Sequence, residues 1–251
     1  MRPSKSNVMF AAALTGIFCV SGMHQAAAAD WSGCYVGGSA GVGVGNGDTG
    51  DKPFTTGPFA GTGASWNSAG APHESISSEG SGLVAGLLGG CDMQAALDSA
   101  TLVFGVAADI SAAGIAANGQ SALSSDTHVD MDVDWTATLR ARAGIAVGNA
   151  LFFASGGLAA ADMTLRASDL STTPSTGTMD ISQSGWQGGW VVGAGVEWRV
   201  NERWSASLEY QHMEFDGVTA TGAAIDPVEA MPRFEGDLDL DIVRLGFLLR
   251  L

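Results

Sequence analysis

The residues that come nearest to a catalytic arrangement are His212 and Glu214, which stand two positions apart. Alternate residues of an extended strand share one face, so an imidazole and a carboxylate at this spacing could share acid–base work. A hydrolytic site would also need a nucleophile beside the histidine. No serine stands at the step where that nucleophile would lie, so we predict no catalytic residues and no enzyme.

Two other sets of side chains could bind a ligand. His73 and His128, with Met131 near the second, could approach an iron ion, although both histidines read more simply as solvated loop residues. Four carboxylates are close enough in sequence to hold a divalent ion: Asp126, Asp130, Asp132 and Asp134. They lack the ordered spacing of a calcium loop. A solvated acidic rim fits them better, so we predict no metal site and no cofactor.

The main pattern of the chain is alternation. Between Met131 and Val147 every odd position is apolar, while the even positions begin with acidic and hydroxyl residues and continue with Arg140 and Arg142. A two-residue period over seventeen residues predicts a strand about twice the usual length, with one apolar and one polar face. In a soluble barrel the apolar face would point into a closed core, so the stripe alone does not decide its orientation. The signal peptide, the alternation of loop lengths, the inward charges and the tryptophans described below assign the odd face to lipid and the even face to the interior of a barrel.

The first residues predict export. Arg2 and Lys5 precede a mostly apolar stretch from Val8 to Val20, and Ala27-Ala28-Ala29 provides small residues for cleavage. We therefore divide the chain into a signal peptide at 1–29 and a barrel at 30–251. Phe18 before Cys19 disfavours a lipidated cysteine, and no later segment has eighteen consecutive apolar residues, which disfavours a membrane-spanning helix.

Composition narrows the partners. The chain of 251 residues carries a formal charge of −15, and removal of 1–29 leaves 9 basic against 26 acidic residues, a net −17. This charge argues against nucleic acid as a partner. It also argues against direct attraction to an anionic membrane surface, although divalent cations could bridge acidic loops to anionic lipid head groups. The 36 glycines and 7 prolines are spread along a hydrophobic chain, which favours crowded sheet over disorder.

Eight strand-like runs follow. They lie at roughly 31–45, 80–95, 101–113, 131–148, 150–165, 185–200, 203–216 and 238–251. Long and short connections alternate, and both chain ends fall on the short side, which predicts an all-β fold: an eight-stranded antiparallel up-and-down transmembrane β-barrel. The long connections predict outer loops at roughly 46–79, 114–130, 166–184 and 217–237.

Charged residues in the polar phase predict the interior. They are Asp109, Arg140, Arg142, Glu197, Arg199, Glu209 and Arg244. A soluble barrel could not hide so many charges in its core, whereas a membrane barrel can pair them inside. We expect Arg140 and Arg142 to face Glu197 and Glu209 and to fill the bore, which is too narrow in an eight-stranded barrel for a wide pore.

Tryptophans in the apolar phase lie near strand ends. Trp198 and Trp204 flank one short turn, and Trp135, Trp186 and Trp190 lie toward the opposite ends. This placement predicts the two aromatic belts of a membrane barrel.

Several stretches together resemble a known family. They are Trp31 to Gly38, Trp135 to Gly144, Ala154 to Ala159, Gly193 to Trp198, Trp204 to Tyr210, and Arg244 to Leu251. Their ordered set is similar to the small eight-stranded outer-membrane β-barrel surface proteins of Gram-negative bacteria, also called porin-like or outer-membrane immunogenic proteins. The resemblance implies a place in the cell outer membrane, with lipid and lipopolysaccharide around the barrel and the barrel-assembly machinery as a partner.

The chain departs from that family in one respect and differs from related enzymes in another. Members usually finish on an aromatic residue that the assembly machinery reads, whereas this sequence finishes on Leu251, which puts assembly efficiency in question. Some similar proteins bind haemin. Lipid A deacylases, which are also eight-stranded barrels, use a histidine and a serine two residues apart, and His212 lacks that serine.

Two local features remain open. Cys34 and Cys91 lie in the apolar phase near the short-turn end of the first two strands, so they are either bridged by a disulfide or two thiols at the lipid boundary. In the last strand Leu238, Leu240 and Ile242 share one face, whereas the apolar residues from Val243 onward share the other. We expect a bulge near 241–243 to cause this change of phase.

The expected role is therefore structural and interactive: an integral outer-membrane barrel that supports envelope integrity and displays loops for adhesion. An inert envelope component and a surface adhesin remain hard to separate at this stage. The alternatives are a barrel that binds haemin or another small ligand, or a narrow porin-like channel. A lipid A-modifying enzyme is the least favoured.

Overall fold

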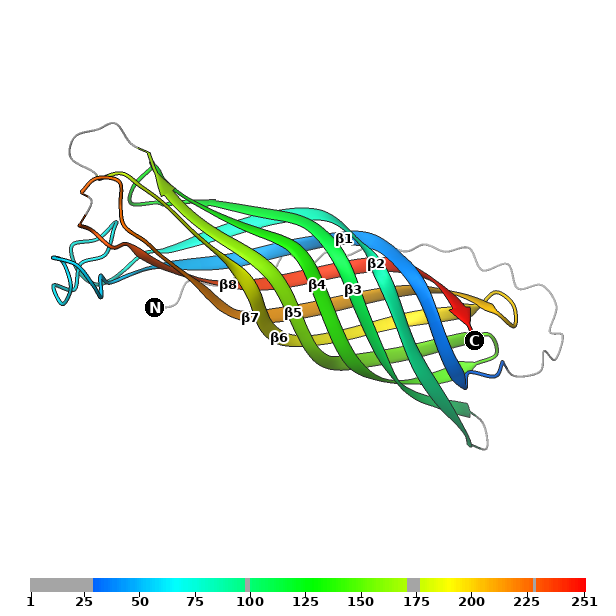
Figure 1. Ribbon diagram of the computed structural model, residues 1–251. Coiled ribbons are helices and arrows are strands. Elements are labelled where there is room, and N and C mark those ends of the chain that lie inside the picture. Colours follow the sequence, from blue (N-terminus) through cyan, green and yellow to red (C-terminus); the bar gives the residue numbers. More distant parts are fainter. Residues whose placement is uncertain (1–28, 98–99, 171–176, 228) are drawn as a thin grey trace.

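The computed structural model describes residues 29–97, 100–170, 177–227 and 229–251. They form eight strands in one closed barrel (Figure 1). The strands are β1 (Gly33–Lys52), β2 (Ser75–Leu97), β3 (Ala100–Gln120), β4 (Thr127–Val147), β5 (Ala150–Asp169), β6 (Met179–Arg199), β7 (Trp204–Thr221) and β8 (Arg233–Arg250). Each strand pairs antiparallel with the next, and β8 closes the ring on β1, so the predicted fold class is confirmed.

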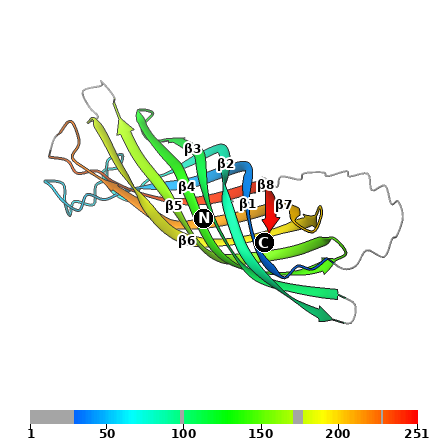
Figure 2. The ribbon, with the colours of Figure 1, turned by 45° about the vertical axis from the view of Figure 1, so that its right-hand side comes forward.

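The barrel has two distinct ends. Short turns and the end of β8 lie together at one end, and the four longer connections lie at the other (Figures 1 and 2). We call the part of the barrel next to the short turns the turn half and the part next to the long connections the loop half. None of the described residues forms a helix long and apolar enough to cross a membrane. The segment predicted as a signal peptide, 1–29, lies outside the described residues except at its last position.

The strands are longer than the sequence pattern predicted. β1 continues to Lys52 and β2 begins at Ser75, so the loop expected at 46–79 shrinks to 53–74. The other three expected loops shrink in the same way, to 121–126, 170–178 and 222–232. The physical reason is that the added strand segments are polar on their outer face. The sequence pattern identified a strand by an apolar outer face, so it assigned these polar segments to loops.

The two halves of the barrel have opposite polarity, as β8 illustrates. In its turn half, Arg244 points inward, and Val243, Leu245 and Phe247 point outward and are exposed. In its loop half the buried inward residues are Phe234, Leu238, Leu240 and Ile242. The outward positions there carry Glu235, Asp237, Asp239 and Asp241. The apolar outer band of the turn half is the surface that suits lipid, whereas the loop half resembles a water-soluble barrel.

The bulge expected near 241–243 does not exist. The register of β8 with both β1 and β7 runs without a break through these residues. The inward face is made of even positions along the whole strand. What changes at this level is the chemistry of the two faces, because the outward side passes from acid at Asp241 to apolar at Val243.

In β4 the sequence predicted unbroken alternation, but the structure has a bulge there, and the backbone phase changes at it. Met131 and Val133 were predicted to face lipid, but both are buried inside the loop half. The pairing of β4 with β5 shifts register between Val133 and Trp135, which places Asp134 in a bulge. The lipid-facing odd stripe therefore begins at Trp135, and the bulge hides this from a strict count of alternate residues.

The segment 53–74, which we call the strap, covers the loop end. Phe54 and Trp66 pack on the apolar core of the loop half. The backbone N–H of Trp66 donates to Asp51 on β1 (3.1 Å), and its indole N–H donates to Asp169 at the end of β5 (3.1 Å). Because β1 and β5 lie on opposite sides of the ring, these bonds hold the strap across the barrel.

Glu74 ties the strap to the next loop. Its carboxylate accepts hydrogen bonds from the Ser121 hydroxyl (2.6 Å) and from the backbone N–H of Ala122 (2.6 Å). Burial opposes the charge on Glu74, but these hydrogen bonds outweigh it and lower the pKa of the carboxyl below its usual value. The Glu74 carboxylate therefore keeps its charge at neutral pH, and its hydrogen bonds to the next loop weaken only when acidification protonates it.

The change of polarity along β8 predicts different responses to the same substitution. Leu245→Arg places a charge on the outer face of the turn half and should lower the free energy of unfolding by about 2–4 kcal/mol. Asp237→Arg, on the outer face of the loop half, should change it by less than about 0.5 kcal/mol. Urea unfolding of the protein in lipid vesicles measures both. Equal losses for the two variants would contradict the assignment of the two halves.

Candidate functional site

Four charged side chains meet in the middle of the bore, and we call them the central cluster: Asp109, Arg140, Glu209 and Arg244. Arg140 lies 3.0 Å from Asp109 and also pairs with Glu209. Arg244 lies 2.8 Å from Asp109 and 2.9 Å from Glu209. The four residues come from β3, β4, β7 and β8, so the cluster spans the barrel, and each side chain is almost fully buried.

Neutral polar groups complete the central cluster. Thr138 donates to Asp109, and Ser155 accepts from Arg140 (3.0 Å). The side-chain oxygen of Gln211, in the amide orientation that satisfies its partners, accepts from Arg140 (2.9 Å) and from Arg244 (2.7 Å). The guanidinium groups thus find acceptors in several directions, which is the condition for a buried ion pair to be tolerated.

A second set, which we call the terminal cluster, lies nearer the short turns and consists of Asp92, Arg142, Glu197 and Arg250. Arg142 lies 3.0 Å from Asp92 and 2.9 Å from Glu197. Arg250 lies 3.2 Å from Asp92 and 2.7 Å from Glu197. Each cluster combines two guanidinium groups with two carboxylates, so its formal charge is zero.

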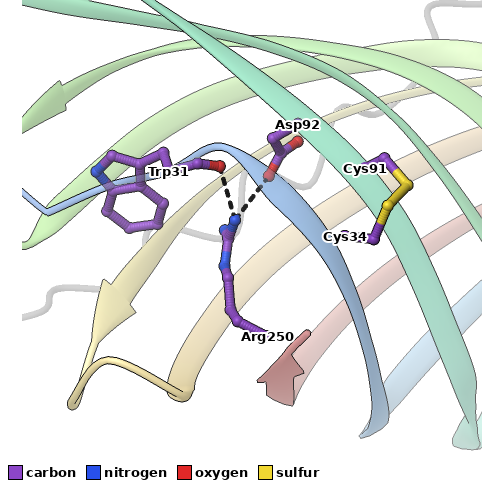
Figure 3. The surroundings of a disulfide bond; sticks show 5 residues. All are labelled: Trp31, Cys34, Cys91, Asp92 and Arg250. Atoms are coloured by element: carbon purple, nitrogen blue, oxygen red, sulfur yellow. Dashed lines mark hydrogen bonds and ion pairs between the residues drawn. A yellow bond between two sulfur atoms is a disulfide. The ribbon is translucent and has the colours of Figure 1, made fainter.

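Trp31 closes the turn end of the bore. It is fully buried, and its carbonyl oxygen accepts a hydrogen bond from Arg250 (2.8 Å). The guanidinium groups of Arg250 and Arg199 lie 5.1 and 5.2 Å from its ring centroid, which is cation–π distance. Figure 3 shows Arg250 directed at both Trp31 and Asp92. The start of the described chain therefore acts as a plug held by the last strand.

Six of the seven charged residues that the sequence placed in the interior lie in these clusters, and the seventh, Arg199, lies over the ring of Trp31. The arginines divide between the clusters: Arg140 pairs with Glu209, and Arg142 pairs with Glu197. Sequence reasoning missed Asp92 and Arg250. A signal for both existed, because each lies in the polar phase next to an outward apolar residue, Asp92 beside Cys91 and Arg250 beside Leu249.

The aromatic residues mark the two edges of the apolar band. Trp135, Trp186 and Trp190 face outward toward the loop half, with exposed fractions of 45%, 54% and 42%. At the short-turn edge Trp198 faces outward, and Trp204 stacks on Phe247 with ring centroids 4.7 Å apart. Amphipathic rings at these two levels suit the interfaces of a membrane.

Cys34 and Cys91 are joined by a disulfide bond. They are direct partners in the register of β1 with β2, and both point away from the bore. Figure 3 shows the bond close to Asp92 of the terminal cluster. The cross-link therefore fixes the first strand pair next to the plugged end of the barrel.

The histidines do not gather at one site. His73 lies on the strap within 3.1 Å of Ser65, and His128 is exposed on the outer wall at the start of β4. Met131 is buried on the inner side of that wall. Within the described part of the chain, no group of three or more His, Cys, Asp or Glu side chains could hold a metal ion.

His212 and Glu214 both face outward on β7. His212 lies 2.9 Å from Asp241, and its ring meets that of Trp190 edge-on at 5.7 Å. Tyr210 donates its hydroxyl to the same carboxylate. The histidine therefore belongs to the outer aromatic edge and points away from the interior.

The central cluster predicts an asymmetry between single and paired substitutions. Arg140→Met leaves Asp109 and Glu209 with one guanidinium and should lower the free energy of unfolding by about 3–5 kcal/mol. The double variant Arg140→Met, Glu209→Gln is again neutral and should recover most of that loss. Urea unfolding in vesicles decides between these outcomes, and an additive double variant would contradict pairing across the bore.

Comparison with known proteins agrees with this geometry. A family model described as "Outer membrane protein beta-barrel domain" matches residues 10–227. The outer membrane protein OprG from Pseudomonas aeruginosa is similar in structure, with a TM-score of 0.54, 12% identity, and coverage of 89% of this chain and 98% of that one. At this identity the likeness shows the fold alone. No curated protein sequence matches the chain.

Two further solved structures have lower TM-scores. The outer membrane protease OmpT from Escherichia coli has a TM-score of 0.46 and 7% identity, over 90% of this chain and 99% of that one. Neisserial surface protein A has a TM-score of 0.37 and 11% identity, over 88% and 98%. Neither carries an argument about activity. The family match, which spans most of the sequence, shows that this chain belongs to the outer membrane protein beta-barrel domain family and is an integral barrel of the outer membrane.

Proposed function

We propose that the protein is a closed barrel that strengthens the outer membrane and makes surface contacts through its loops. The observation that carries this proposal is the filled bore. Trp31 and the terminal cluster occupy the turn end, the central cluster lies in the middle, and an apolar core under the strap fills the loop half. A solute would have to displace all of these layers.

The energetic argument against conduction is local. Opening the central cluster would separate two arginines from two carboxylates in a region without bulk water, and breaking one such buried pair costs about 3–5 kcal/mol. The core above it is mostly apolar, and its inward hydroxyls at Thr49 and Ser78 are buried against Met131. A narrow porin-like channel is therefore less favoured than a structural role.

The loops supply the argument for surface contacts. In the described parts of the four long connections, the large apolar side chains that are exposed number four, one in each connection: Phe59, Leu123, Leu170 and Ile225. Single exposed apolar residues are common on proteins, but four at one end of a barrel offer anchors to a host or envelope ligand. Adhesion is therefore part of the proposal.

The remaining parts of the proposal concern assembly and chemistry. Export by the segment 1–29 and insertion by the barrel-assembly machinery would bring the apolar band into lipid and lipopolysaccharide. We propose no catalytic role for His212, because it is directed at Asp241 on the outer wall and its ring packs edge-on against Trp190.

Planar-bilayer recording tests the closed bore. We expect the refolded monomer to give no stable conductance, because each layer of the bore is filled. The double variant Arg140→Met, Glu209→Gln, which keeps the apolar core, should also stay silent. Stable, large conductance from the wild-type monomer would overturn the proposal.

A complementation experiment separates the structural role from the adhesive one. A strain that lacks the protein should become more sensitive to detergent and should adhere less to an octyl-coated surface. The wild-type protein should restore both properties. A variant with serine at Phe59, Leu123, Leu170 and Ile225 should restore detergent resistance only. If loss of the protein changes neither property, both parts of the proposal fail.

A further inference from the structure

The wall of the barrel is incomplete between β6 and β7. These strands pair only from Gly189 to Arg199 on β6 and from Ser205 to Phe215 on β7. Yet β6 begins at Met179, bonded to β5, and β7 continues to Thr221, bonded to β8. Figures 1 and 2 show β6 and β7 side by side near the turn end and separating toward the loops.

The gap has a defined lower and upper limit. Below, pairing begins at Gly189 and Phe215. Above, the backbone N–H of Thr178 donates to Asp226 (2.7 Å), and the N–H of Ile225 donates back to Thr178 (2.8 Å). We call the space between these limits, with 182–188 on its β6 side, the slot.

The free backbone groups of β6 in the slot can be identified from the parity of the strand. Successive residues of a strand point their N–H and C=O to opposite sides. The N–H of Arg199 bonds to Asn149 on the β5 side, whereas the N–H groups of Val200 and Thr178 bond on the side of β7. Even positions therefore face the slot, and within it they are Ser182, Ser184, Trp186 and Gly188.

These even positions have no backbone partner among the described residues. One of their carbonyl oxygens, that of Ser184, accepts a hydrogen bond from a side chain, Nε2 of Gln183 (3.1 Å). The two faces of β6 are also uncrowded here, since an added Cβ would meet no atom within 4 Å at Gly185 on the inner face or at Gly188 on the outer face. An unpaired edge of this kind is a template for one more strand.

The surroundings of the slot are acidic. Exposed carboxylates lie at both of its limits and on its β6 side: Asp180, Glu214, Asp226 and Glu229. Arg166 pairs with Asp180 at 2.6 Å and offsets its charge, so the acidic character comes mainly from the other three carboxylates. The chain as a whole carries −15, so a positively charged partner is favoured and a second copy of the same chain is disfavoured.

We propose that the slot binds an extended, basic peptide segment of another protein by strand addition to β6. Main-chain hydrogen bonds to the even positions would supply affinity, and the carboxylates at the limits would select positive charge. The slot lies in the wall, so this inference goes beyond the loop contacts proposed above. It rests on the proposed function only in requiring that the slot opens to water above the outer aromatic edge, which Trp186 marks.

A binding assay with defined peptides tests the proposal. The probe is a short fluorescent peptide of alternating lysine and valine, and its matched control has glutamate in place of lysine. Fluorescence polarisation on the refolded wild-type protein should detect binding of the basic peptide and at least about tenfold weaker binding of the acidic one. Equal binding of both, or binding of neither, would overturn the proposal.

Substitution at Ser184 isolates the backbone contribution. Ser184→Pro removes a slot-facing N–H but no bond to β5, and it should weaken binding of the basic peptide about tenfold. Ser184→Ala keeps the N–H and should bind within about twofold of wild type. Equal affinities of the two variants would contradict strand addition. Light scattering that shows a dimer which Ser184→Pro dissociates would show that a second copy of the chain occupies the slot, and would overturn the assignment of the partner.

Charge reversal keeps the test decisive if Ser184→Pro does not fold. The double variant Glu214→Lys, Asp226→Lys should lose the basic peptide and gain the acidic one. Unchanged preference would overturn the assignment of the partner's charge. Bilayer silence and detergent resistance depend on the bore and not on the slot, so failure of this inference is distinguishable from failure of the proposed function.

Discussion

The structure depends on the pairing of four arginines with four carboxylates inside a barrel that is apolar on the outside. An eight-stranded barrel has an interior just wide enough for side chains, so whatever lines it must pack and satisfy itself. The central and terminal clusters meet this requirement by drawing their members from strands across the ring. Because each cluster is neutral, the charges can lie within the membrane-spanning part of the barrel without an unpaired ion.

The second constraint is that the same strands continue beyond the membrane. There water replaces lipid on the outside, and the polarity of both faces reverses. In β8 the reversal occurs with no change of backbone phase, whereas in β4 a bulge at Asp134 accompanies it. The outer part of the barrel thereby gains an apolar core of its own, which the strap covers. The closed bore of the loop half and its exposed, acidic outer wall therefore both follow from the reversal of polarity along the strands.

Part of this could be predicted from the sequence. The alternation from Trp135 to Val147, the order of eight strands and the barrel class follow from period and phase, which are local properties. The inward charges followed from the same phase. Asp92 and Arg250 were missed because each is a single charge near a strand end, where one residue carries little periodic signal. The strand extensions were missed because segments with polar outward residues, glycine and serine have the composition of loops. The bulge in β4 was missed because it is defined by the pairing of β4 with β5, and the sequence of one strand does not reveal that pairing.

The level at which the outer face changes from apolar to acidic is the central claim. It is tested most directly by single cysteines placed in turn at Asp237, Asp241 and Leu245, all outward positions of β8. The two native cysteines of the barrel are bonded to each other and would not compete. With a membrane-impermeant maleimide on intact cells, the account predicts labelling at 237 and 241 and protection at 245 until the membrane is dissolved. Labelling at 245 on intact cells, or protection at 237, would contradict it.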